Sequence, residues 1–119
     1  MRRRFALQDL PPSYGRAPLP DEYDEGVRLF EQATERYEAS DFNAAADGFA
    51  TAARVFVVRD EHDYANDFRR NRLIALRNAT WSLKMVDQDE RARQLLDAAA
   101  ADDATTAPDV RGIAEALLS

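Results

Sequence analysis

Apolar residues recur at spacings of three and four along most of this chain, and that period places side chains on one face of an α-helix. It predicts four main helices, over residues 21–39, 42–58, 63–86 and about 90–101. A short fifth helix is expected over residues 109–118. No segment shows sustained alternation with period two, so the pattern predicts an all-α fold made of antiparallel helical hairpins.

Proline and glycine divide the chain into two parts. Four of the five prolines lie within the first twenty residues, and the fifth is Pro108. The residues between Pro20 and Pro108 include no proline and only two glycines, Gly26 and Gly48, which is typical of continuous helical hairpins. We therefore expect an extended, Pro-rich N-terminal arm over residues 1–20 and a helical domain over residues 21–119.

The helical part contains an internal repeat at an offset of 47 residues. In each copy a small residue is followed four positions later by a large apolar one, and three positions after that by another small one. Small residues suit places where two helices approach closely. The copies cover about residues 26–59 and 73–106. The aligned pairs are Leu29 with Leu76, Ala33 with Thr80, Asp41 with Gln88, Ala45 with Ala92, Phe49 with Leu96, and Ala52 with Ala99.

Residues 37–45 and the small–aromatic–small positions Ala45, Phe49 and Ala52 resemble the tetratricopeptide (TPR) repeat. The offset exceeds the TPR period of about 34 residues, and only two copies are present where three or more are usual. The extra residues are expected to lengthen the second or third helix. Under this resemblance the fifth helix caps the stack or another chain continues it. The alternative is a generic bundle of four or five helices.

Charged residues are segregated along the chain. The chain carries 16 basic and 22 acidic side chains, a net charge of −6. Residues 1–20 have a net charge of +3, residues 21–67 of −9, residues 68–84 of +5 and residues 85–119 of −5. The total argues against general nucleic-acid binding, which takes a net basic face. The basic band between two acidic blocks suits an acidic partner or intramolecular charge balance.

The sequence offers little material for catalysis. It has no cysteine and a single histidine, and it shows no glycine-rich phosphate loop or nucleophile–base arrangement. His62 lies among acidic residues and is interpreted as part of an acidic helix start rather than a metal ligand. We expect no enzyme activity, cofactor or metal. Apolar runs are too short to span a bilayer, no secretory signal is evident, and a cytoplasmic, bacterial protein is the expectation.

The TPR resemblance implies a binding groove, because the first helix of each TPR repeat lines a concave surface that accepts a peptide or a helix. Transferring those positions gives a basic, aromatic-bearing set with Trp81 as apolar anchor, suited to an acidic segment or a terminal carboxylate. A true carboxylate clamp is not expected, since only Asn78 is placed for it. The set is Phe30, Thr34, Tyr37, Arg70, Arg77, Asn78, Trp81 and Lys84.

Two alternatives remain open for these residues and for the arm. Trp81 can belong to the core, with the arginines paired to Glu31, Glu35 or Glu38. The arm can dock on its own chain or insert into a partner, and its residues 11–14 also fit the PPxY pattern bound by WW domains. The apolar anchors of the arm are Phe5, Leu7, Leu10 and Tyr14.

The sequence thus favours a non-enzymatic protein–protein interaction module, acting as an adaptor, a chaperone or an assembly factor. The first alternative is a permanent structural subunit of a larger complex or a homo-oligomer. A small enzyme or metal protein is the second.

Overall fold

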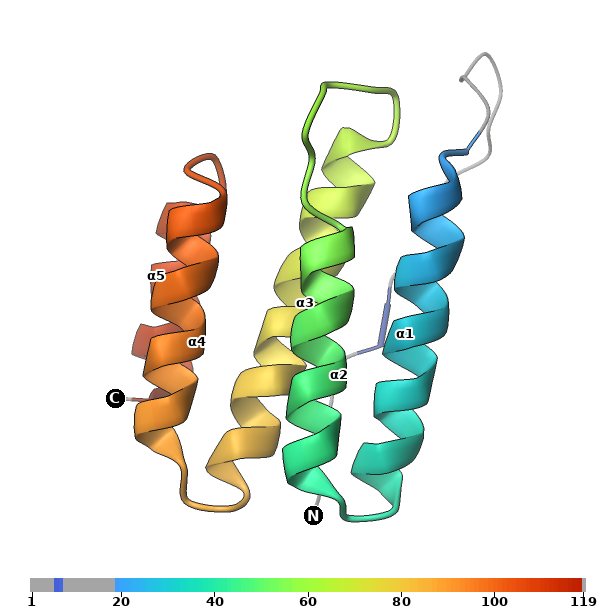
Figure 1. Cartoon of the computed structure of the whole chain (residues 1–119). Coiled ribbons are helices and arrows are strands. Elements are labelled where there is room, and N and C mark those ends of the chain that lie inside the picture. Colours follow the sequence, from blue (N-terminus) through green and yellow to red (C-terminus); the bar gives the residue numbers. More distant parts are fainter. Residues whose placement is uncertain (1–5, 8–18, 119) are drawn as a thin grey trace.

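Five α-helices follow one another in the computed structural model, which describes residues 6–7 and 19–118 (Figure 1). Because these residues contain no strand, the predicted all-α fold is confirmed. The proposed arm lies largely outside the described residues. The helices are α1 (Asp21–Glu38), α2 (Phe42–Val55), α3 (Ala65–Lys84), α4 (Asp89–Asp102) and α5 (Ala107–Leu118).

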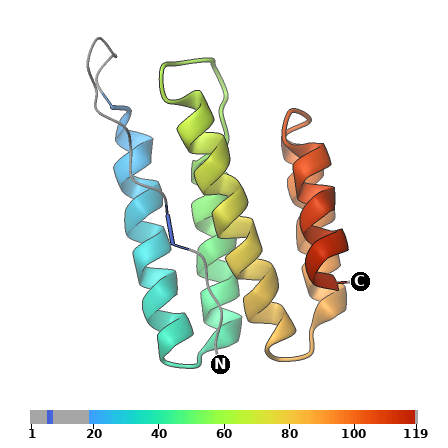
Figure 2. The same cartoon turned by 180° about the vertical axis from the view of Figure 1, so that it is seen from behind.

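The helices run alternately up and down and form two layers. In the view of Figure 2, α1, α3 and α5 form the front layer, and α2 and α4 form the layer behind it. Figure 1 shows the same two layers from the opposite side. Each helix packs on the next along the chain, and α3 also contacts α1 and α5. Helix α3 is therefore the central element, since it touches all four of the others.

The end of α2 differs from the prediction more than any other helix boundary does. Helix α2 ends at Val55, and the chain turns at Phe56, although the prediction continued the helix to residue 58. The run of residues 55–58 is rich in valine, whose branched side chain disfavours the helix, and Phe56 and Val57 are buried outside it. Helix α3 begins at Ala65, two residues later than predicted.

The main hydrophobic cluster joins all five helices. The small–large–small positions of both repeat copies lie in it, and each of these six side chains is buried. On α2 the alanines lie beside Phe49, whose ring meets that of Phe30 edge-on at a centroid distance of 5.0 Å. The spacing found in the sequence is therefore a packing pattern: alanines let the helices approach and one large side chain fills the space between them.

A second, smaller cluster closes the end of the molecule where α2 stops and α3 starts. Phe56, Tyr64 and Phe68 are buried in it. The ring of Phe56 meets those of Tyr23 and Phe68 at centroid distances of 6.0 and 5.7 Å. This aromatic cluster explains why the chain leaves the helix at Phe56, because the turn brings that ring between α1 and α3.

The turns after α1 and α3 have the same geometry. Ser40 and Asp87 adopt positive φ angles of 64° and 57°. After α1 the amide of Asp41 donates to the carbonyl of Arg36, and after α3 the amide of Gln88 donates to that of Leu83. Both are Schellman C-caps, in which a left-handed residue ends the helix. Ser40 and Asp87 are 47 residues apart in the sequence, so the repeat extends to the turns.

We expect Ser40→Gly to stabilise the protein by about 1 kcal/mol, because a residue with a Cβ is strained at positive φ and glycine is not. Ser40 is exposed, so the change removes no packing. The measurement is the midpoint of urea unfolding. Ser40→Ala is the matched control and should be less stable than Ser40→Gly; equal midpoints would contradict the strain.

Helices α1 and α2 approach closely at Gly48. A Cβ built on Gly48 would lie 2.8 Å from the Cβ of Ala33 and 3.3 Å from its Cα, which no side-chain rotation can relieve. At Gly112 on α5, a Cβ would meet no atom within 4 Å. The same substitution therefore has opposite consequences at the two positions.

We expect Gly112→Ala to stabilise the protein by about 0.5–1 kcal/mol, through the helix propensity of alanine. At Gly48 the gain in propensity is outweighed by overpacking, which typically costs about 1–3 kcal/mol. Thermal unfolding followed by circular dichroism measures both. A rise in Tm for Gly48→Ala as large as that for Gly112→Ala would show that the two helices separate freely.

Candidate functional site

Three of the eight predicted groove residues lie inside the protein. Phe30 and Tyr37 on α1 belong to the main hydrophobic cluster, and Asn78 on α3 is fully buried. Tyr37 packs edge-on against Phe42 at a centroid distance of 5.2 Å. These side chains support the surface from beneath and do not form part of it.

The other five lie at or near the surface of the layer that α1, α3 and α5 form. Arg70 is exposed, with one of its nitrogens 3.8 Å from a carboxylate oxygen of Asp67. Arg77 and Trp81 are half-buried on the same side of α3, as their spacing requires. We call the surface of α1 and α3 on this side the α1–α3 face. Thr34 on α1 is also half-buried, and its hydroxyl donates to the carbonyl of Phe30 at 2.9 Å.

Lys84, the last predicted groove residue, is turned toward α5. Its ammonium group donates to the carbonyl of Leu117, and Arg93 on α4 donates to the carbonyl of Leu118 at 2.6 Å. Both carbonyls belong to the last turn of α5, where a helix leaves acceptors unsatisfied and carries partial negative charge. Part of the basic band thus serves the packing of the chain itself.

The arm contributes one described anchor to the α1–α3 face. Leu7 is half-buried and packs against the main hydrophobic cluster. Figure 2 shows residues 6–7 in front of the space between α1 and α3. The other predicted anchors, Phe5, Leu10 and Tyr14, lie outside the described residues.

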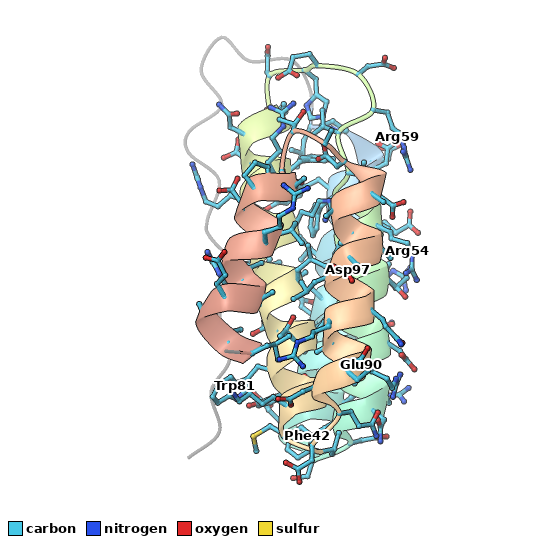
Figure 3. The ribbon with its side chains drawn as sticks, turned by 90° about the vertical axis from the view of Figure 1, so that its left-hand side faces the viewer. Phe42, Arg54, Arg59, Trp81, Glu90 and Asp97 are labelled. Carbon is cyan, nitrogen blue, oxygen red and sulfur yellow. The ribbon has the colours of Figure 1, made fainter. Side chains whose placement is uncertain are left out.

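A groove on the opposite side of the protein contains a residue that sequence reasoning missed. The groove lies between α2 and α4, and Arg72 of α3 contributes to its lining. We call it the Arg72 groove; its volume is about 290 Å³. In Figure 3, Arg54 of this groove and Trp81 of the α1–α3 face project from opposite sides of the molecule. The lining residues are Asp47, Ala50, Thr51, Ala53, Arg54, Arg72, Leu95, Ala98, Ala99 and Asp102.

Arg72 is a buried cation. Its side chain is only 2% exposed, and Nη2 donates to the carbonyl of Ala99 in the last turn of α4 at 2.8 Å. Within the described part of the chain, its Nε and Nη1 are buried without a hydrogen-bond partner. Burial lowers the pKa of the guanidinium, while the charges of Asp103 and Asp102 oppose that change. The group still remains charged at neutral pH.

The sequence did contain a signal for the burial of Arg72. The residue lies four positions after Phe68 and three before Ala75, on the apolar stripe that predicted the buried face of this helix. Arg72 is also one of the five cations of the basic band over residues 68–84, and the band as a whole was expected at the surface. A charged residue on an apolar stripe was the available indication of an unusual site.

The described residues show no group of three or more His, Cys, Asp or Glu side chains placed to hold a metal ion. His62, the residue nearest to such a role in the sequence, accepts a hydrogen bond at Nδ1 from the amide of Tyr64 at 3.1 Å and packs on Phe68. None of the described helices is both long and apolar enough to cross a membrane.

Comparison with protein-family models, with curated proteins and with solved structures finds no match to this chain. What is established is therefore the class of fold, a two-layer arrangement of five antiparallel helices.

Proposed function

We propose that this chain is a non-enzymatic protein–protein interaction module whose α1–α3 face binds an extended peptide or a helix of a partner. The observation that supports this best is Leu7. It comes from outside the five helices, yet it packs against the main hydrophobic cluster at this face. A surface that accepts an apolar side chain from an arm of its own chain can accept one from another protein.

The charge and the aromatic surface of the face support a partner with an acidic segment. Arg70 is exposed there, and Trp81 offers a half-buried aromatic surface one helical turn from Arg77. An aromatic anchor next to an arginine is the residue combination enriched at the energetic centres of protein interfaces. In this proposal the helices form a TPR-like stack, and the protein acts as an adaptor, a chaperone or an assembly factor in the cytoplasm.

The test compares partner binding by the wild-type chain and by the double variant Arg70→Glu, Arg77→Glu. The partner is first identified by co-purification and mass spectrometry from the native cells, and its affinity is then measured with purified proteins. We expect the double variant to bind at least about tenfold more weakly, since it reverses two charges facing an acidic segment. Unchanged affinity with unchanged helicity by circular dichroism would refute this site.

A permanent structural subunit is the second candidate, and a specific surface favours it. A groove of about 500 Å³ between α4 and α5 is lined by Leu96, Ala100, Val110 and Ala114 with charged residues around them. Another helix stacked there would continue the two layers. The molar mass of the purified chain in solution separates the candidates, because an obligate subunit self-associates or aggregates alone and an adaptor is monomeric.

A further inference from the structure

The Arg72 groove holds a buried charge that forms no ion pair within the described chain, although the carboxylates of Asp102 and Asp103 favour it electrostatically. A guanidinium carries five N–H donors, and in Arg72 the one acceptor within the described chain is the carbonyl of Ala99. No described carboxylate forms an ion pair with it. Buried charges in proteins are ordinarily paired, because an isolated one is costly.

The groove beside this charge has the composition of a binding site for a small anionic group. Its walls carry four alanines, whose short side chains leave room next to the guanidinium. Arg54 stands at the edge, exposed, and donates to the hydroxyl of Thr51 at 3.2 Å. Of the two acids that line the groove, Asp47 is already paired with Arg91 at 3.5 Å, and Asp102 offsets part of the charge of Arg72 without forming an ion pair with it.

We propose that the Arg72 groove binds a carboxylate of the protein partner, from an acidic side chain or from a chain terminus. Arg72 is the anchor, because its planar guanidinium can meet both oxygens of a carboxylate with parallel N–H donors. Arg54 adds a second positive charge at the edge, and the alanines contact the apolar stem of the ligand. This inference rests on the proposed function, since the ligand belongs to a protein partner.

The site differs from the α1–α3 face in both place and chemistry. Arg70 and Arg72 are two residues apart on α3, so their side chains leave the helix on opposite sides. Arg70 is exposed and lies near Asp67, whereas Arg72 is buried. Arg28→Met is a matched control for Arg72→Met: it removes the same charge at an exposed position on α1, a helix that lines no part of the groove.

The experiment titrates the full-length chain, labelled with ¹⁵N, with three short peptides and observes the Arg72 Nε–Hε resonance by NMR. One peptide has a free C-terminal carboxylate, the second has an amidated C-terminus and one Asp side chain, and the third is amidated and has no acid. Sulfate is titrated separately at matched ionic strength. We expect a saturable shift with one or both of the carboxylate peptides and none with the third.

The variants decide whether Arg72 is responsible. Amide resonances of α2 and α4 report binding in Arg72→Met, where affinity for the active peptide should fall at least about tenfold. Arg28→Met should bind as the wild type does. The proposal is overturned if no carboxylate peptide binds, if Arg72→Met binds as tightly as wild type, or if sulfate alone binds, which would indicate an adventitious ion only.

The outcome also separates this inference from the proposed function. A partner bound equally by the wild type and by Arg72→Met would refute the carboxylate site and leave the interaction module intact. Absence of any partner would refute the proposed function. The peptide titration would then decide separately whether the Arg72 groove binds carboxylates.

Discussion

Phe49→Ala is expected to lower the free energy of unfolding by about 3–5 kcal/mol, the range measured for removing a large aromatic side chain from a core. Phe49 is fully buried on α2 and packs edge-on against Phe30 of α1. The side chains of the surrounding alanines are too short to fill the space that the Phe49 ring would leave. Because whole domains are stable by about 5–15 kcal/mol, this one change should consume a large share of the stability.

Urea unfolding followed by circular dichroism at a helical wavelength measures the loss. Phe42→Ala is the matched control, since Phe42 stands on the same helix and also makes an edge-on aromatic contact, but is half-buried. It should destabilise the protein clearly less. Equal losses for the two variants would show that the two-layer core does not depend on the large residue of the repeat.

Phe56→Ala is expected to have a comparable but local effect, of about 3 kcal/mol. Phe56 is fully buried at the end of α2 and joins Tyr23 to Phe68 in the aromatic cluster. Its loss should loosen the start of α1 and the chain leading into α3. Hydrogen exchange should therefore accelerate in those segments and stay unchanged in α4 and α5. Uniform acceleration would contradict a separate cluster.

Gly26 allows a more specific test of the position of the Phe56 ring. A Cβ at Gly26 would lie 2.5–2.9 Å from three atoms of the Phe56 ring, so Gly26→Ala alone should destabilise the protein. In the Phe56→Ala background the obstacle is gone, and the same change should be neutral or stabilising. A double-mutant cycle measures this coupling. Additive effects of the two changes would show that the ring is not held at that position.

The sequence predicted the helices more accurately than it predicted which residues lie at the surface. The all-α fold and its five helices follow from local rules, because apolar spacings of three and four are visible along a single sequence. The end of α2 was misplaced, because the aromatic cluster that holds Phe56 joins residues from three separate segments. Such contacts between distant segments are not encoded in local periodicity.

The candidate site was harder to predict for a related reason. Helix α3 touches the four other helices, so one apolar stripe does not describe which of its sides are buried. Asn78, placed in the groove by its spacing, is inside the protein, and so is Arg72, whose place on the apolar stripe was the one indication of its burial. Arg70, on the opposite side from Arg72, remains exposed. A helix surrounded by neighbours requires the tertiary arrangement before its accessible residues can be named.

The packing of each helix on the next has a consequence for how the chain folds. Contacts between neighbours in sequence keep the average loop that must close short, and proteins of this kind fold within microseconds to milliseconds. Each hairpin can form as soon as its second helix has been synthesised, without waiting for the rest of the chain. Long-range pairing therefore does not limit the folding rate, and intermediates with exposed core should be short-lived.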